Sequence, residues 1–308
     1  MRIEDIEYAL PTTPIDATNF DIQKWREENP MDYLKAMYFI NNSHNKNESF
    51  KAIYQITRLY IPDILYKYYS LTENAFFNEQ KLNTLIQKKI YMSEISCLND
   101  PFDNKAFFYQ PAELMNYALL KPHNGKLIDD FSSFNRVTCM TSNKITSLPM
   151  WAHYSNNHAG FCVSYDMKYN RILSDCTFPV QYTEERIDIT STMKQQTEYI
   201  MNEIASNPNK DMLEIIHNDL SLVYLCAFFS NIKHSSWSYE NEFRCTMGAN
   251  AKGMPYIDAT PKEIYIGMNC SQNNQDKLIS IANTLQIPIY QMQFDELDTN
   301  FNLSYKRI

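Results

Sequence analysis

Ile64-Leu-Tyr-Lys-Tyr-Tyr69 is the stretch of sequence on which the fold assignment depends. Aromatic and β-branched residues dominate it, and such side chains favour a short strand. Residues 21–60, before it, have apolar side chains at helical spacing, whereas strand-like and helix-like segments mix after it. We therefore predict a helical N-terminal extension over residues 1–60 and a separate α+β domain over residues 61–308.

The order of the expected elements indicates the fold class. Expected strands cover residues 89–93, 135–141, 160–166, 179–182, 243–247, 263–268 and 287–293. Expected helices cover residues 21–40, 48–60, 72–88, 148–154, 192–207, 211–232 and 272–285. Strands and helices do not alternate strictly, so we expect an α+β fold with a mixed β-sheet core packed by helices.

The composition of the 308 residues limits the possible functions. The formal net charge is −8, which argues against broad nucleic-acid binding but leaves room for a pocket that holds one nucleotide. Only 5 residues are glycine, and neither G-x-G-x-x-G nor G-x-x-x-x-G-K-[ST] occurs. Rossmann and P-loop nucleotide sites are therefore not expected.

The seven cysteines and the N-terminus point to a cellular compartment. The cysteines are widely spaced and form no C-x-x-C pair, so we expect reduced, mostly buried thiols. The first residues lack the apolar core of a signal peptide, and the apolar run at residues 220–229 is too short to cross a bilayer. We expect a cytoplasmic protein that does not enter membranes.

A first polar segment covers residues 93–103. Asn99-Asp100-Pro101 predicts a sharp turn, because Asn and Asp side chains bond nearby backbone groups and proline fixes φ. Asp100 and Asp103 are candidates to bind a metal or to orient a ribose. The alternative is that both carboxylates only cap backbone N–H groups of a rigid turn.

A second polar segment runs from Pro149 to His158. Trp151 and Tyr154 offer flat rings on which a base or a nicotinamide could stack. His153 and His158 are five residues apart, which does not place them on one helical face as a pair of metal ligands. The alternative is that Trp151 belongs to the core and that His153 is a structural histidine.

A third polar segment runs from Lys233 to Arg244. If it is a strand, Glu240, Glu242 and Arg244 lie on one face, because side chains alternate along a strand. Two neighbouring carboxylates repel each other unless a cation bonds them, and Arg244 or Lys233 is the candidate cation. The alternative is a salt-bridged strand edge without function.

Taken in order, these segments resemble a known family. The chain is similar, over about residues 64–292, to the bacterial family called domain of unknown function 2971. The resemblance rests on six blocks: Leu65-Tyr-Lys-Tyr, Tyr91-Met-Ser with Asn99-Asp-Pro-Phe-Asp103, Cys139-Met-Thr, Met150-Trp-Ala-His-Tyr with His158-Ala-Gly-Phe-Cys162, Trp237-Ser-Tyr-Glu-Asn-Glu-Phe-Arg244, and Glu263-Ile-Tyr-Ile-Gly267. The first block departs from the family, which usually has arginine where this chain has Tyr69. The family name implies a domain and no reaction.

A second resemblance suggests chemistry. Glu240-Asn-Glu242 resembles the Glu-x-Glu strand of NAD-dependent ADP-ribosyltransferases, and residues 138–142 resemble their Ser-Thr-Ser strand. The resemblance implies NAD as cofactor, with Glu242 holding the ribose and stabilising an oxocarbenium-like state. It further implies that Glu240 activates the acceptor. Tyr69 replaces an expected arginine, so Lys67 or Arg244 would have to meet the phosphates.

The remaining candidates complete this interpretation, in which Trp151 or Tyr68 would stack on the nicotinamide. The candidate catalytic residues are Glu242, Glu240 and His153. The candidate cofactor-binding residues are Lys67, Tyr68, Asn99, Asp100, Trp151, Tyr154, His158, Trp237 and Arg244. We expect these residues to converge on one cavity, and a role in a toxin or in phage defence would suit such an enzyme.

Two other functions remain open. One is a binding module that senses a nucleotide or a nucleic-acid end without catalysis, with the N-terminal helices docking a partner protein or a second copy. The other is a metal-dependent hydrolase or nuclease that uses Asp100, Asp103, His153 and His158.

Overall fold

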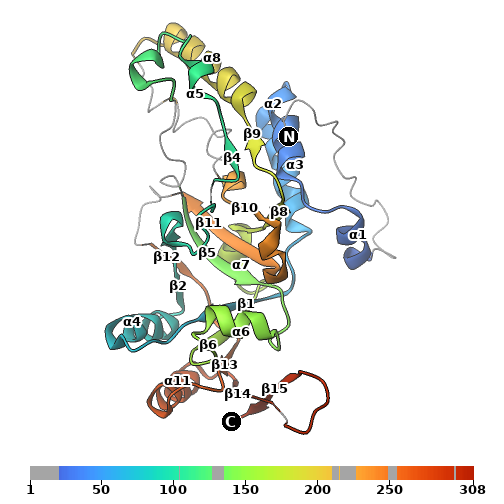
Figure 1. Cartoon of the computed structure of the whole chain (residues 1–308), viewed down its shortest axis with the longest axis vertical. Coiled ribbons are helices and arrows are strands. Elements are labelled where there is room, and N and C mark those ends of the chain that lie inside the picture. Colours follow the sequence, from blue (N-terminus) through green and yellow to red (C-terminus); the bar gives the residue numbers. More distant parts are fainter. Residues whose placement is uncertain are drawn as a thin grey trace.

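A mixed β-sheet forms the centre of the molecule (Figure 1). The computed structural model describes residues 21–103, 105–126, 135–209, 215, 227–248, 255–294 and 296–308. Within these ranges one sheet has nine strands, in the order β15-β14-β13-β6-β1-β5-β11-β7, and β3 pairs with β5. The strands are β1 (Ile64–Tyr69), β3 (Ser93–Glu94), β5 (Asn135–Thr141), β6 (Phe161–Asp166), β7 (Thr177–Pro179), β11 (Glu242–Gly248), β13 (Glu263–Ile266), β14 (Ile289–Phe294) and β15 (Leu303–Arg307). Only the β13–β14 pair among them is parallel, so the expected mixed sheet is confirmed.

Three short strand pairs lie outside this sheet in the described ranges. Two of these pairs are parallel: β10 (Ile232–His234) with β8 (Gln181–Thr183), and β4 (Phe107–Phe108) with β9 (Ile187–Asp188). The third is antiparallel: β12 (Tyr256–Asp258) with β2 (Lys89–Tyr91).

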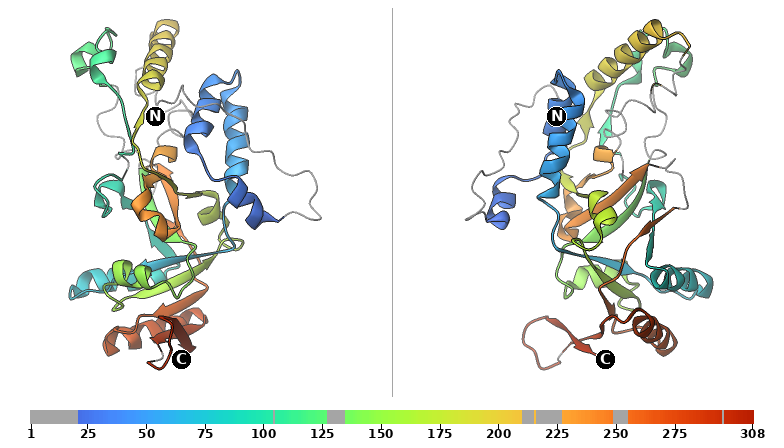
Figure 2. Two further views of the ribbon diagram at one scale, coloured as in Figure 1. Left: turned by 45° about the vertical axis from the view of Figure 1, so that its right-hand side comes forward. Right: turned by 180° about the vertical axis from the view of Figure 1, so that it is seen from behind.

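Helices cover the two ends of the sheet, and the expected α+β class is confirmed (Figure 2). α4 and α11 lie together at the end that carries β13 and β14, while α2, α3 and α8 lie towards the other end. The helices are α1 (Ile22–Glu28), α2 (Tyr33–Asn42), α3 (Lys46–Arg58), α4 (Ala75–Ile86), α5 (Pro111–Leu114), α6 (Leu148–Tyr154), α7 (Arg171–Asp175), α8 (Thr190–Ser206) and α11 (Gln272–Leu285), with 3₁₀ turns η3 (Ile95–Cys97), η4 (Lys121–His123) and η6 (Ser235–Glu240).

The N-terminal helices pack against the sheet end. Apolar side chains of α2 and α3 share one buried cluster with Phe178, Met193 and Phe228. The buried Tyr33 hydroxyl donates to the carbonyl of Pro179 at 2.6 Å. The boundary near residue 60 stays a prediction, but these contacts tie both sides of it into one hydrophobic core.

The single helix expected over residues 21–40 is wrong, because the chain forms α1 and α2 instead. Pro30 interrupts the helical pattern, since proline lacks a backbone N–H donor. Asp21 and Asp32 each cap one of the two helices by accepting backbone hydrogen bonds.

The other local expectations divide into three groups. The bounds expected for β1, β5, α6 and α11 are confirmed. The strand expected over residues 179–182 is divided between β7 and β8. The leader at residues 1–19, and residues 211–214 and 216–226 of the helix expected at 211–232, lie outside the described residues.

The expectation that Glu240, Glu242 and Arg244 share one strand face is wrong. Glu240 ends the 3₁₀ turn η6, and Asn241 has a left-handed φ of 44° before β11 begins at Glu242. Asn adopts this conformation more readily than most residues. Glu240 therefore reaches its place from a turn, and only the other two side chains belong to β11.

A glycine fixes the position of α6 beside β1. A Cβ atom at Gly160 would lie 2.0 Å from the carbonyl oxygen of Tyr69, a distance that no side chain tolerates. Gly160 thus lets the turn after α6 touch the end of β1. This close approach holds the polar end of α6 over the sheet.

Candidate functional site

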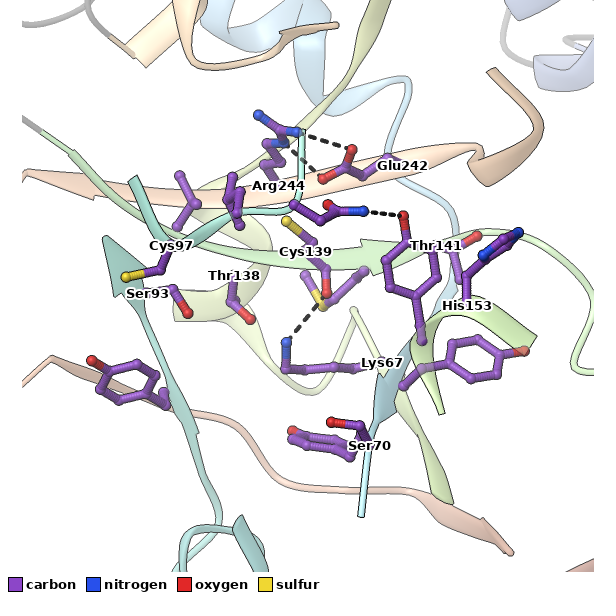
Figure 3. A pocket seen from close by; sticks show the side chains of 18 of the residues that line it. Lys67, Ser70, Ser93, Cys97, Thr138, Cys139, Thr141, His153, Glu242 and Arg244 are labelled. Carbon is purple, nitrogen blue, oxygen red and sulfur yellow. Dashed lines mark hydrogen bonds and ion pairs between the residues drawn. The ribbon is translucent and has the colours of Figure 1, made fainter. Parts of the chain in front are cut away.

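One cavity of about 850 Å³ joins segments that are far apart in the sequence (Figure 3). It is lined by strands β1, β5 and β11, by helices α4 and α6, and by the turns around η3 and η6. Of the residues expected from the sequence, those that line it are Lys67, Tyr68, Asn99, His153, Tyr154, Glu240, Glu242 and Arg244. The three candidate catalytic side chains therefore face one space, as expected.

Asp100 and Trp151 do not line this cavity, which corrects their expected binding roles. Asp100 Oδ1 accepts the backbone N–H of Phe102 at 2.9 Å, as the capping alternative predicted. Trp151 is 0% exposed and donates its indole N–H to the carbonyl of Ile145 at 2.7 Å. A ring without exposed surface cannot stack on a ligand.

His158 and Trp237 are also held elsewhere. The His158 ring stacks on Trp151 with 6.1 Å between the ring centroids. The Trp237 ring faces the ammonium group of Lys233 at 4.6 Å, and neither ring belongs to the cavity lining. Trp237 therefore supports a charged residue of the site, and its expected direct role in binding is corrected.

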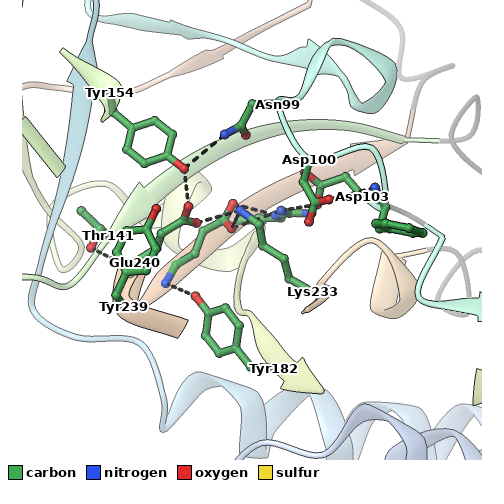
Figure 4. Close-up of polar contacts among 12 residues, drawn as sticks. Asn99, Asp100, Asp103, Thr141, Tyr154, Tyr182, Lys233, Tyr239 and Glu240 are labelled. Carbon is green, nitrogen blue, oxygen red and sulfur yellow. Dashed lines mark hydrogen bonds and ion pairs between the residues drawn. The ribbon is translucent and has the colours of Figure 1, made fainter. Parts of the chain in front are cut away.

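A network of buried charges forms one wall of the cavity (Figure 4). Lys233 Nζ lies 2.7 Å from Glu240 Oε2 and 3.2 Å from Glu242 Oε2. Arg244 Nε donates to Glu242 Oε1 at 2.7 Å, and Arg244 Nη2 donates to Asp103 Oδ1 at 2.6 Å. Two cations and three carboxyl groups are thus paired away from water, and such pairing is what makes buried charges tolerable.

Arg244 uses all of its guanidinium nitrogens to bond protein groups. Its side chain is 0% exposed, and Nη1 donates to the carbonyl of Ser230 at 2.7 Å. With Glu242 and Asp103 as its other partners, the guanidinium bonds protein groups through all three nitrogens. Arg244 therefore orients Glu242, and its expected role as a phosphate ligand is corrected.

Glu240 is held by neutral groups as well as by Lys233. The Tyr154 hydroxyl donates to Glu240 Oε1, and the Asn99 side-chain amide reaches the same hydroxyl at 3.5 Å. Thr141 Oγ1 donates to the backbone carbonyl of Glu240 at 2.5 Å. The first two bonds tie α6 and the turn after η3 to the carboxyl group of Glu240, and the third ties β5 to its backbone.

The two glutamates have pKa values displaced in opposite directions. Burial raises the pKa of Glu240 and the charge of Glu242 raises it further, while Lys233 opposes both effects. Burial would also raise the pKa of Glu242, but Arg244 and Lys233 lower it to about 2. Of the two glutamates, Glu242 is therefore held in its ionised form, and Glu240 is the one that takes up a proton more readily.

Lys67 stands on another wall of the cavity. Its ammonium group reaches the carbonyl of Cys139 at 3.4 Å and forms no ion pair with any residue in the described ranges. Burial lowers the pKa of Lys67, and the nearby groups of Cys139 and Glu242 offset part of this shift. This cation is the best placed candidate for an anionic part of a ligand.

His153 supplies an imidazole at the same cavity. It lies in the last turn of α6, with its ring 6.1 Å from that of Tyr239 and 6.4 Å from that of Tyr154. The four candidate ligands of the metal-dependent interpretation do not meet there. Among the described residues, no three His, Cys, Asp or Glu side chains are grouped closely enough to hold a metal ion.

Sequence reasoning missed several lining residues or gave them a minor place: Asp103, Thr138, Cys139, Thr141, Lys81 and Lys233. Strand pairing places Cys139 beside Arg244 and Thr141 beside Glu242. No local pattern predicts that register. Lys233 was available only as a candidate cation, because its approach to Glu240 depends on the η6 turn.

Residues 150–245 match the family model described as protein of unknown function (DUF2971). The chain is therefore similar to this family over these residues. This confirms the expected family over these residues, and the blocks outside them stay a prediction. The matched residues include His153, Tyr154, Glu240, Glu242 and Arg244, whereas Lys67 and Asp103 lie outside the match. No curated protein and no solved structure matches the chain.

None of the helices in the described ranges has the length and apolar character needed to span a bilayer.

Proposed function

We propose that the protein is an NAD-dependent, ADP-ribosyltransferase-like enzyme that breaks the bond between nicotinamide and ribose. One observation carries the proposal. Glu240 and Glu242 share the ammonium group of Lys233, yet their pKa values are displaced in opposite directions. Pairs of carboxyl groups with such different environments divide the roles of acid–base group and fixed charge.

Glu242 is suited to the fixed charge. Arg244 and Lys233 hold its carboxylate in place before any ligand binds, so little reorganisation accompanies the reaction. Breaking the bond between carbon and nitrogen leaves positive charge on the ribose as nicotinamide departs with the electron pair. The ionised carboxylate stabilises that charge, as a carboxylate does in glycoside hydrolysis.

Glu240 is suited to proton transfer. Its raised pKa brings it closer to neutral pH, where a general base works best. It would take the proton of the acceptor, whose oxygen or nitrogen forms the new bond to the ribose carbon. Tyr154 and Lys233 fix the direction of its carboxyl group.

The cavity also fits a ligand of this class. Its volume of about 850 Å³ falls in the range of about 300–1,000 Å³ found for small-molecule sites. Lys67 offers a cation without a carboxylate partner among the described residues, which suits a phosphate group.

The direct test is the release of nicotinamide from NAD, with and without candidate acceptors. We expect turnover by the wild-type protein and a loss of about 10²–10³-fold in Glu242→Gln, the magnitude typical of removing one fixed electrostatic group. Glu240→Gln should lose turnover while retaining NAD binding. Glu94→Gln, which alters an exposed glutamate paired with Arg136, is the control and should keep full activity.

Circular dichroism of each variant separates loss of the site from loss of the fold. Absence of nicotinamide release from the folded wild-type protein, or full activity in folded Glu242→Gln, would contradict the proposal.

A second function is favoured by the rings around the cavity. Its lining tyrosines are Tyr66, Tyr68, Tyr69, Tyr91, Tyr154 and Tyr256. Aromatic rings stack on bases without any chemistry, so a nucleotide-sensing module would use the same space. NAD that raises the melting temperature without ever releasing nicotinamide would favour this alternative.

A further inference from the structure

Two lysines line the cavity without a counter-ion in the described part of the chain. Lys67 comes from β1 and Lys81 comes from α4, and neither forms an ion pair there. Burial lowers the pKa of both ammonium groups. A half-buried cation without a counter-charge is unfavourable, and an anion placed between the two lysines would relieve that cost.

Hydroxyl groups lie beside these lysines. Lys81 Nζ donates to the backbone carbonyl of Ser70 at 2.6 Å and lies 3.2 Å from its hydroxyl oxygen. Thr138 is only 2% exposed, and its Oγ1 has no hydrogen-bond partner among the residues that the structure describes. Figure 3 shows the Thr138 hydroxyl between Ser93 and Lys67, so an unused buried donor faces the same space as the cation. Buried polar atoms rarely lack a partner, and a bound ligand is one explanation.

Exposed aromatic rings form the rim of this part of the cavity. Phe77 is 54% exposed, Tyr91 is 47% exposed and Tyr256 is 37% exposed, although all three line the cavity. The rings of Tyr91 and Tyr256 are 5.6 Å apart across the β2–β12 pair. Such rings offer apolar faces on which a planar base can stack.

We propose that Lys67, Lys81 and Thr138 form a phosphate subsite and that Phe77, Tyr91 and Tyr256 flank the attached base. The ligand class is a nucleoside diphosphate. The identification of this ligand with the ADP half of NAD rests on the proposed function. Binding at the subsite requires no turnover, so the two proposals can fail separately.

Isothermal titration of the full-length protein with ADP tests the subsite. We expect Lys67→Met and Lys81→Met each to raise the Kd for ADP about tenfold or more, because each removes a charged hydrogen bond. Thr138→Val keeps the side-chain volume and should raise the Kd several-fold. Lys168→Met, which alters an exposed lysine with 72% of its side chain accessible, is the control and should leave the Kd unchanged.

A comparison of ADP with inorganic pyrophosphate separates the base from the phosphates. Tyr256→Ala should weaken ADP and leave pyrophosphate binding unchanged. No ADP binding to the wild-type protein, or Kd values within twofold of wild type in both lysine variants, would overturn the phosphate subsite. Equal affinity for ADP and pyrophosphate would overturn the role of the rim.

Nicotinamide release by the same variants distinguishes the two proposals. ADP binding that depends on Lys67 and Lys81 in a protein that never cleaves NAD would support the subsite and contradict the proposed function. Cleavage of NAD that is unaffected by both lysine variants would support the function and contradict the assignment of the ADP half of NAD to this subsite.

Discussion

Two walls of the same cavity differ in whether their buried charged side chains form ion pairs. On the wall built by β11 and η6, Arg244 and Lys233 bond the carboxylates of Asp103, Glu240 and Glu242. On the wall built by β1 and α4, Lys67 and Lys81 have no ion-pair partner among the described residues. Ion pairs fix the positions of the charged side chains before a ligand binds. A buried cation without an ion-pair partner can instead be compensated by an anionic ligand. The two proposals above rest on this contrast, because they assign the chemistry to the first wall and the binding of an anion to the second.

The largest effect on stability is expected from removing a cation of the paired wall, the wall built by β11 and η6 whose charged side chains form ion pairs. Arg244→Met leaves Glu242 and Asp103 as buried carboxylates without their main cation. The free energy of unfolding should fall by about 3–5 kcal/mol, as it does when one partner of a buried ion pair is removed. Urea denaturation followed by circular dichroism measures this loss.

Arg136→Met is the matched control, because its ion pair with Glu94 is partly exposed. It should cost about 1 kcal/mol or less. A loss of similar size in the two arginine variants would contradict the view that the buried network is a preorganised unit.

Acid should weaken the paired wall through Glu242. Its folded-state pKa of about 2 lies below the ordinary value of 4.5, so its stabilisation is present above that ordinary value and is lost as the pH falls towards 2. Between about pH 6 and pH 3, the wild-type protein should lose about 2 kcal/mol more unfolding free energy than Glu242→Gln. Glu240 acts in the opposite direction, because stability from its raised pKa is lost as the pH rises through that pKa. Equal acid sensitivity of wild type and Glu242→Gln would break this account.

Removing a cation from the unpaired wall, the wall built by β1 and α4, should not lower the free energy of unfolding. Lys67→Met removes a cation whose pKa is lowered by burial, and it keeps an unbranched apolar side chain against Tyr69. The unfolding free energy without ligand should stay unchanged or rise by about 1 kcal/mol. A clear loss of stability would show that Lys67 already has a structural partner.

The smallest effect concerns a thiol beside the paired wall. A hydrogen bond with Cys245 lowers the pKa of Cys176 to about 7, against the opposing effect of burial. Alkylation of Cys176 by iodoacetamide, followed by mass spectrometry, should reach half of its maximum rate near that pH, because the thiolate is the reactive form. In Cys245→Ser, the pH at which alkylation of Cys176 reaches half of its maximum rate should change. Alkylation that rises only above pH 8.5, the range of an ordinary thiol, would contradict this contact.

Local patterns predicted the elements whose ends carry local signals. β1 and β5 are rich in β-branched and aromatic or other apolar residues, and α11 has a regular apolar face, and the bounds expected for all three are confirmed. The prediction of a strand through Glu240 was wrong because no sequence pattern in this run of polar residues predicts the left-handed conformation of Asn241. The alternation of acidic and polar residues in Glu240-Asn241-Glu242 therefore does not show that all three belong to one strand.

The site was predicted in part for a related reason. Residue types identified Glu242, Glu240 and His153, which do line the cavity. Trp151 shows the limit, because a core ring and a stacking ring are the same residue type until burial is known. The bond between Arg244 and Asp103 joins positions 141 residues apart, and only the folded chain brings them together.

The most direct measurement is the crystal structure of Glu242→Gln soaked with NAD, in which loss of turnover should preserve the bound ligand. We predict phosphate oxygens within hydrogen-bond distance of Lys67 and Lys81, the adenine at the rim of Phe77, Tyr91 and Tyr256, and the nicotinamide ribose beside Glu240. A cavity that stays empty at saturating NAD, or NAD bound with its phosphates remote from both lysines, would contradict the account.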